Sequence, residues 1–466
     1  MLLSNRSSQY QNQYSLVNED GWLPLGALRR HIAALPPELL ADIFFFCLPF
    51  DEDLIVRPDP DDAPLVLCAV CRQWRTLALT TPRLWSSVYF VWDFWEPNAA
   101  LYVELCRNWI SRARSTPLSL MLSTNASDPA VDSLLETIGE VSQQWQNIQL
   151  GGALPFSFPF SGNGKYPLLE KLRISPFGPL SFDQPMLSFH DAPRLRDVFI
   201  TTYTTRIQLP FHQLTKFGTL SIDLEPCLEL LRHALNLVEA HLRISWYDAS
   251  ALPNTVFSLP QLRSLNLGGT WMEMLPISLL KCLKTPALRT LALGFEDARN
   301  RAPADVSSFL SFVSQSAFKL HTLTLSCLPV TPGALLECLK ATPSVIHLKL
   351  QIWPGIVDMN PVFAAFTGHR DFLPNLESFG LAFSTWQPTV DAPIVDASVV
   401  VDMLIWRCLT STATRLQSFV YDSYDLEETV QSYIKAHSVY PELEALGVNL
   451  DLDEGTDVGP FVDVLP

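Results

Sequence analysis

Glycine and charged residues are both scarce in this chain, whereas proline is abundant. Charged residues make up 17% of the 466 residues, and 36 prolines outnumber 19 glycines, which reverses the usual excess of glycine over proline. Both departures are typical of many short buried strands separated by turns that contain proline. Hydrophobic residues reach 48%, so a chain of this length can bury a large core.

Basic residues are too few to form an extended positive surface. The formal net charge is -16, and two segments carry most of it. Residues 51–62 contain six acids and one arginine, and residues 441–466 contain seven acids and no lysine or arginine. Because nucleic-acid binding depends on lysine and arginine at the phosphates, the sequence predicts no nucleic-acid partner.

Long hydrophobic runs and a secretion signal are also missing. The longest apolar run, residues 39–50, is interrupted by Asp42 and is too short to span a bilayer. No signal-peptide pattern opens the chain. Nine cysteines, an odd number, lie between Cys47 and Cys408, which suits reduced thiols better than a disulfide framework. We therefore expect an intracellular protein of the cytoplasm or nucleus without membrane contact.

Motifs that carry catalysis or bind a cofactor are not found. Residues 68–71 (Cys-Ala-Val-Cys) have the spacing of metal ligands, but no second ligand pair accompanies them, so we interpret them as core thiols. Residues 162–165 (Gly-Asn-Gly-Lys) lack the first glycine and the final hydroxyl residue of a phosphate-binding loop. We expect no enzymatic activity, no cofactor and no metal.

The sequence of the N-terminal region predicts a disordered segment followed by short helices. Residues 1–30 lack apolar periodicity, which indicates a disordered segment. From Leu35, an early proline pair, Glu38 and apolar residues spaced by three and four predict a helix to about Leu48. A second helix is predicted over residues 65–79, ended by Thr81-Pro82 and followed by a Leu-Trp pair. Helices this short must bury their apolar faces against something else.

Five short motifs occur in this region: LPPELL at 35–40, Ile-Phe at 43–44, VCRQWR at 70–75, Leu-Ala at 77–78 and PRLW at 82–85. Together they resemble an F-box over residues 33–90, of the type common in mushroom-forming fungi. The resemblance implies binding to a Skp-type adaptor, and through it to the cullin and RING subunits of a ubiquitin ligase. It would place the following residues against the adaptor: Leu35, Pro36, Glu38, Leu39, Ile43, Leu48, Leu65, Val70, Cys71, Trp74 and Trp85.

In that family the connection between the first two helices is usually short, whereas here it contains the acidic insertion at 51–62. The affinity for the adaptor is the implied property that this difference affects. The alternative is that residues 33–90 form only a helical cap on the first repeat.

One phrase, Pro-x-L-x-x-L-x-L with conservative replacements, recurs along the rest of the chain. It begins at Pro167, Pro193, Pro260, Pro286, Pro343, Pro374 and Pro441. Versions without the proline start at Trp145, Leu237, Leu320 and Leu416, with a weaker one around Phe217. The steps mostly lie near 25 residues, which is a repeat period. Alternating apolar residues point inward from a short strand, and a return of ~15 residues lets the next strand pair in parallel.

This array resembles a divergent leucine-rich-repeat horseshoe over residues 145–450. Residues 91–144 form a transition with the first irregular repeats, and residues 451–466 form an acidic tail. Strands at 86–91 and 118–122 are expected to begin the stack, and residues 307–313 and 333–339 are expected to be return helices. The predicted fold class is α/β: a three-helix F-box followed by an irregular leucine-rich-repeat-like solenoid of parallel strands with helical returns.

The concave face of such a solenoid is the expected binding surface for a target protein of unknown identity. The non-leucine positions of each strand point to this face, and aromatic residues follow several strands. The predicted target-binding residues are Arg173, His241, Trp246, Asn266, Trp271, Lys349 and Trp353, with at least two of the three tryptophans exposed. The resemblance implies the substrate-recognition subunit of an SCF-type ubiquitin ligase. The alternative is a non-catalytic leucine-rich-repeat scaffold without a ligase role.

Overall fold

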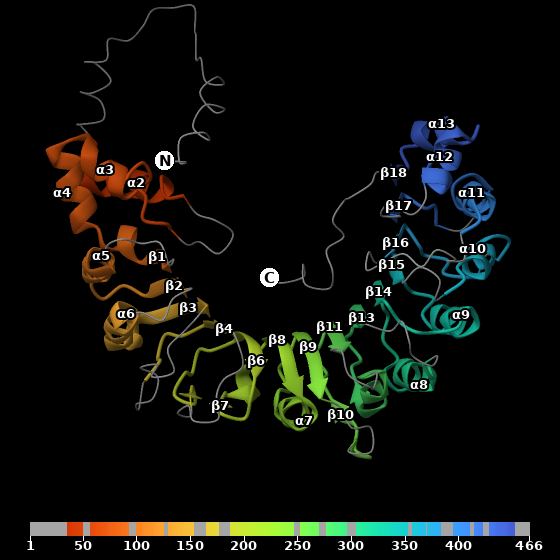
Figure 1. Cartoon of the computed structure of the whole chain (residues 1–466), viewed down its shortest axis with the longest axis horizontal. Helices are drawn as coiled ribbons and strands as arrows, with labels where there is room; N and C mark the ends of the chain where they lie inside the picture. The colour runs from red at the N-terminus through yellow and green to blue at the C-terminus, as the bar shows by residue number, and fades with distance from the viewer. Residues whose placement is uncertain are drawn as a thin grey trace, which may run out of the picture.

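The chain forms an open arc whose strands line the inner side and whose helices lie outside (Figure 1). A computed structural model describes the following residues: 35–49, 56–92, 99–124, 129–152, 165–176, 187–246, 252–269, 276–295, 304–352, 357–369, 371–383, 395–410, 414–422 and 428–452. Helices α2, α3 and α4 stand at one end of the arc, and α12 and α13 stand at the other. This arrangement confirms the predicted α/β class and the solenoid architecture.

One sheet of 14 parallel strands runs the length of the arc. Its strands in spatial order are β1 (Ser87–Trp92), β2 (Leu118–Thr124), β3 (Trp145–Gly152), β4 (Lys171–Pro176), β6 (Asp197–Tyr203), β8 (Lys216–Asp223), β9 (Glu239–Trp246), β11 (Ser264–Gly269), β13 (Thr290–Phe295), β14 (Thr322–Ser326), β15 (His347–Ile352), β16 (Ser378–Phe383), β17 (Ser418–Asp422) and β18 (Asn449–Asp451). The predicted first two strands, at 86–91 and 118–122, are β1 and β2.

The leucines of the repeated phrase align across neighbouring strands. One ladder joins Leu265, Leu291, Leu323, Leu348 and Phe379 on β11, β13, β14, β15 and β16, and all five side chains are buried. Full burial of such a side chain contributes roughly 1.5–3 kcal/mol. A shift of one residue would turn every leucine outward, so the repeated spacing fixes the register.

Most returns between strands are helices on the outer side. The helices are α2 (Pro37–Phe46), α3 (Leu65–Val70), α4 (Arg72–Thr80), α5 (Ala99–Ala113), α6 (Pro129–Glu140), α7 (Leu224–His233), α8 (Ser307–Ser316), α9 (Pro332–Lys340), α10 (Asn360–Phe366), α11 (Ala397–Ile405), α12 (Glu428–Ala436) and α13 (Tyr440–Ala445). Helices α8 and α9 confirm the two predicted return helices.

Returns near the middle of the arc differ from the prediction because they contain short strands. Strand β5 (Leu187–Ser188) pairs with β7 (Ile207–Gln208), and β10 (Phe257–Ser258) pairs with β12 (Leu283–Lys284). Three of these four strands end two residues before a proline. Since the residue before proline is biased to extended backbone, these returns favour short ladders over α-helices.

The predicted helix over 65–79 is two helices. Cys71 separates α3 from α4 with an extended backbone (φ -160°, ψ 170°), and its Sγ accepts a hydrogen bond from the Trp74 backbone N–H at 3.4 Å. Cys71 therefore caps the N-terminus of α4, a role more often taken by serine or aspartate. Helix α4 ends at Thr80, as the Thr81-Pro82 pair predicts.

The last repeat phrase, which begins at Pro441, forms a helix and not a strand. Proline in the first turn and two glutamates favour α13. Gly447, with φ +74°, ends this helix, and the Val448 N–H bonds to the Leu443 carbonyl at 3.1 Å, which is the Schellman arrangement. The final strand therefore starts only at Asn449.

The buried core is continuous from α2 to the residue that follows β18. At its N-terminal end, the Val56 carbonyl oxygen accepts a hydrogen bond from the Tyr89 N–H at 2.8 Å, which covers part of the edge of β1. All nine cysteines lie in the described segments and carry free thiols. Within those segments, none of the helices is both apolar enough and long enough to cross a membrane.

Candidate functional site

Two surfaces of the arc stand out as candidate binding sites. The first, here called the helical surface, consists of Leu39, Ile43, Phe46 and Val70 at the N-terminal end. Their exposed fractions are 52%, 45%, 82% and 56%. Exposed apolar side chains gathered in one region mark an interaction surface.

Helix α2 buries one apolar face and exposes three further apolar side chains on its other side. Leu40 and Phe44 are fully buried, and the Phe44 ring lies 4.8 Å from the Trp74 ring of α4, measured between centroids. Leu39, Ile43 and Phe46 follow at steps of four and three and therefore share the opposite face. Among the described residues, no other element covers this exposed face.

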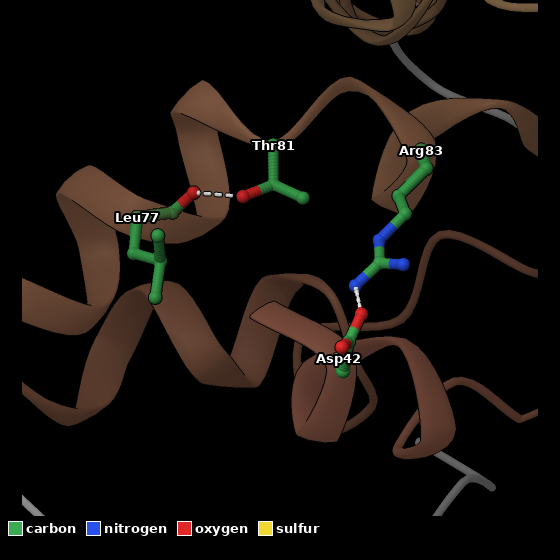
Figure 2. Close-up of polar contacts among 4 residues, drawn as sticks. All are labelled: Asp42, Leu77, Thr81 and Arg83. Atoms are coloured by element: carbon green, nitrogen blue, oxygen red, sulfur yellow. Dashed lines mark hydrogen bonds and ion pairs between the residues drawn. The ribbon is translucent and has the colours of Figure 1, made fainter. Parts of the chain in front are cut away.

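An ion pair holds α2 against the short 3-10 helix Pro82–Trp85, as Figure 2 shows. The Arg83 guanidinium forms an ion pair with Asp42 and lies 5.2 Å from the Phe45 ring centroid. In the same view the Thr81 hydroxyl donates to the Leu77 carbonyl at 2.7 Å at the end of α4. The ion pair is half-exposed, so it orients α2 but adds little stability.

The residues predicted to face an adaptor divide into three groups. Those on the surface are Pro36, Glu38, Leu39, Ile43, Val70 and Cys71, those partly buried are Leu35, Leu65 and Trp74, and those buried are Leu48 and Trp85. The structure thus corrects the assignment of Leu48 and Trp85, because side chains only 6% and 0% exposed belong to the chain's own core. Phe46 was not predicted, although its spacing from Leu39 and Ile43 was a usable signal.

The second candidate, here called the concave surface, is built from two rows of outward side chains on strands β4 to β15. Strand register aligns the first row as Lys171, Asp197, Lys216, Glu239, Ser264, Thr290, Thr322 and His347. It aligns the second row as Arg173, Phe199, Gly218, His241, Asn266, Ala292, Thr324 and Lys349. Four predicted target-binding residues, Arg173, His241, Asn266 and Lys349, therefore lie in one row.

Three long side chains on this surface lie over a glycine of the following strand. A Cβ on Gly218 would come 2.6 Å from the Phe199 ring, one on Gly268 would be 3.7 Å from Arg243 Cγ, and one on Gly380 would be 3.8 Å from Lys349 Cγ. Each glycine is the register partner of the side chain that covers it. The glycines therefore let these side chains lie along the sheet.

Gly218→Ala should lower the free energy of unfolding by about 1–3 kcal/mol, because a buried Phe199 ring must move away from the new methyl group. In a Phe199→Ala background, the same substitution should cost less than about 0.5 kcal/mol, because the clash is gone. Urea unfolding of the four proteins of this double-mutant cycle measures both values. Equal costs in the two backgrounds would contradict the contact.

Charges on the concave surface are partly paired. Lys216 Nζ lies 2.7 Å from Glu239 Oε2, with both side chains more than a third exposed. Burial lowers the pKa of the His241 imidazole, the Glu239 carboxylate opposes this shift, and the Lys216 ammonium adds to it. His241 is therefore neutral at neutral pH. Burial also lowers the pKa of Lys349, against the opposing effect of Asp422.

The three tryptophans predicted to bind the target at the strand ends cannot all be placed. Trp246 ends β9, and its side chain is outside the described part, as are Trp271 and Trp353. The expected exposure of two of these tryptophans therefore stays a prediction. Residues 1–30, 51–55 and 453–466, which cover the N-terminal segment, three of the six acids of the insertion and most of the acidic tail, also lie outside the described residues.

Comparison of the chain with models of known protein families and with curated protein sequences finds no match. The resemblance to an F-box therefore rests on the motifs and on the surface just described.

Proposed function

We propose that this chain is the substrate-recognition subunit of an SCF-type ubiquitin ligase, acting in the cytoplasm or nucleus. The helical surface would bind a Skp-type adaptor, and the concave surface would bind the target protein. The observation that carries the proposal is the exposed face of α2, where Leu39 and Ile43 occupy positions that the F-box resemblance assigns to the adaptor contact. An apolar stripe of this kind requires a partner.

The arrangement of the two surfaces suits such a role. Helices α2 and α3, which carry the helical surface, lie at one end of the arc, and the strands that carry the concave surface line its inner side (Figure 1). An adaptor docked at the end would leave the inner side open to a target. The chain would then contribute proximity and orientation, and the chemistry of ubiquitin transfer would belong to the other subunits.

Co-expression with a Skp-type adaptor tests this proposal. The wild type should co-purify with the adaptor, and Leu39→Asp/Ile43→Asp should lower the affinity at least 100-fold, because interface anchors contribute about 2 kcal/mol or more each. Both side chains are exposed, so circular dichroism should show an unchanged fold. Trp74→Ala is a poorer probe, because Trp74 also contacts Phe44.

The matched control is Leu235→Asp, since Leu235 is 53% exposed in the turn between α7 and β9. It should co-purify like the wild type. A folded wild type that does not bind the adaptor, or a double variant that binds as well as the control, would contradict the proposal.

A second candidate is a leucine-rich-repeat scaffold without a ligase role. The continuous core favours it, because α2 to α4 would then serve as the cap that a terminal repeat needs. A cap alone does not explain why Phe46 is 82% exposed. The co-purification experiment separates the two candidates.

A further inference from the structure

The concave surface has the opposite charge to the chain as a whole. Its two rows, the neighbouring Arg243 and the Asp422 that acts on Lys349 carry five lysines or arginines and three carboxylates, a net charge of +2, whereas the chain carries -16. The cations are Lys171, Arg173, Lys216, Arg243 and Lys349. A positive surface on an acidic protein concentrates anionic partners and repels basic ones.

These cations are spread along the arc and do not meet at one point. They lie on β4, β8, β9 and β15, and neighbouring strands are about 4.8 Å apart. The seven strand-to-strand steps from β4 to β15 therefore span roughly 34 Å along the sheet, the length of about 10 extended residues. A single phosphate group needs convergent donors, whereas several carboxylates along a peptide match this spacing.

The middle of the surface, between Arg243 and Lys349, is free of charge and of bulk. Strands β11, β13 and β14 present Ser264, Asn266, Thr290, Ala292, Thr322 and Thr324, all partly accessible. Short hydroxyl and amide side chains can bond to the main chain of a peptide that crosses the strands. No large side chain in the two rows of these strands obstructs such a path.

The glycine contacts fix where the flanking charges lie. Arg243 extends over Gly268 toward the uncharged stretch, and Lys349 extends over Gly380 away from it. The two cations thus lie on either side of the uncharged middle of the surface. In the first row Asp197 lies between Lys171 and Lys216, and Glu239 lies beside Lys216. These carboxylates would oppose the uniform phosphate charge of a nucleic acid.

We propose that the concave surface from β4 to β15 binds an extended segment of the target protein that is rich in aspartate and glutamate. The segment crosses the strands. Its carboxylates contact the flanking cations, and its main chain passes over the serine, threonine and asparagine side chains of β11, β13 and β14. This inference rests on the proposed function only for the statement that the partner is a ligase target. Binding of the segment itself does not involve the adaptor.

Fluorescence polarisation of the full-length protein with a labelled 14-residue Asp/Glu peptide tests the proposal without any adaptor. We expect saturable binding that weakens as salt is raised from 50 to 200 mM, because the contacts are between exposed charges. Arg173→Glu/Lys349→Glu should weaken binding at least 10-fold. A labelled Lys/Ser peptide of the same length should not bind.

The matched control is Lys281→Glu/Lys340→Glu, which makes the same change of net charge at two exposed lysines in the returns, outside the two rows. It should bind the acidic peptide within twofold of the wild type. Absence of binding, or an equal loss in the control, would overturn the proposal. Binding of a phosphoserine peptide without acidic residues, in preference to the Asp/Glu peptide, would overturn the choice of carboxylates. Failure of adaptor co-purification would leave this result unaffected, so the two proposals fail separately.

Discussion

Trp85→Ala should lower the free energy of unfolding of the N-terminal end of the arc by about 3–5 kcal/mol, the usual cost of truncating a fully buried large aromatic side chain. The Trp85 ring lies 4.8 Å from the Trp109 ring of α5. Its indole N–H donates to the Ala78 carbonyl at 2.8 Å, and the Arg112 guanidinium lies over its face at 4.5 Å. Trp85 therefore connects α4 to α5, and its loss would leave a cavity where these helices meet.

Equilibrium urea unfolding followed by circular dichroism and by tryptophan fluorescence measures this effect. The matched control is Phe46→Ala, an aromatic truncation in the same region at a side chain that is 82% exposed. It should change the stability by less than about 0.5 kcal/mol. A Trp85→Ala protein as stable as the control would show that the ring is not in the core. Under the proposed function, the pair also separates stability from binding, because Phe46→Ala should weaken binding of the adaptor to the helical surface and leave the fold intact.

The strand positions were the most predictable part of the fold. In phrases such as those at Leu169, Leu262 and Val345, the strand begins two residues after the first apolar position of the phrase. The reason is physical: each strand must bury the same alternate positions as its neighbours, so the apolar spacing and the register are one constraint. After the phrase at Leu443 the strand starts only at Asn449, six residues after the first apolar position, because Gly447 and the preceding glutamates favour a helix with a Schellman end.

Helix boundaries were less predictable because they depend on single residues. The apolar pattern over 65–79 is continuous through Cys71, and nothing in its periodicity indicates an extended residue there. The break between α3 and α4 follows from the hydrogen bond that the Cys71 thiol accepts from the Trp74 N–H. Sequence patterns do not predict this capping role for a cysteine. In the middle of the arc, proline positions would have been a usable indication that returns such as 257–260 are extended.

The candidate sites also have some features that the sequence could predict and others that it could not. Alternation along each strand predicts that Arg173, His241, Asn266 and Lys349 face outward, and register then brings them into one row. Alternation cannot predict that Phe199 is only 8% exposed on the same row, since that depends on the missing Cβ of Gly218 on the next strand. Nor could the resemblance to an F-box predict that the Trp85 side chain points into the core, because a sequence motif does not give the direction of a side chain.

Arg407 is the site of the second large effect, because its buried guanidinium has no acidic partner among the residues that the structure describes. Its side chain is 1% exposed, and its two terminal nitrogens donate to the carbonyl oxygens of Phe372 and Leu373. The guanidinium lies 5.2 Å from the ring centroids of both Phe366 and Trp406. Burial lowers its pKa to about 10, so the group is still protonated at neutral pH. Arg407 thereby attaches the end of α11 to the loop that precedes β16.

Arg407→Ala should therefore lower the free energy of unfolding by about 3 kcal/mol or more. It removes the ring contacts and the arginine donor to the buried Phe372 carbonyl, a loss that costs about 1–3 kcal/mol. The Leu373 carbonyl keeps the hydrogen bond from the Leu376 N–H. Arg407→Met restores apolar volume but no donors, so it should recover only part of the loss, leaving about 2 kcal/mol. Arg194→Met, at an exposed arginine before β6, is the matched control and should be neutral. Urea unfolding of the three variants distinguishes the contributions. If Arg407→Met is as stable as the wild type, the rings alone account for the contact, because the hydrogen bonds to the loop carbonyls then merely replace those made with water.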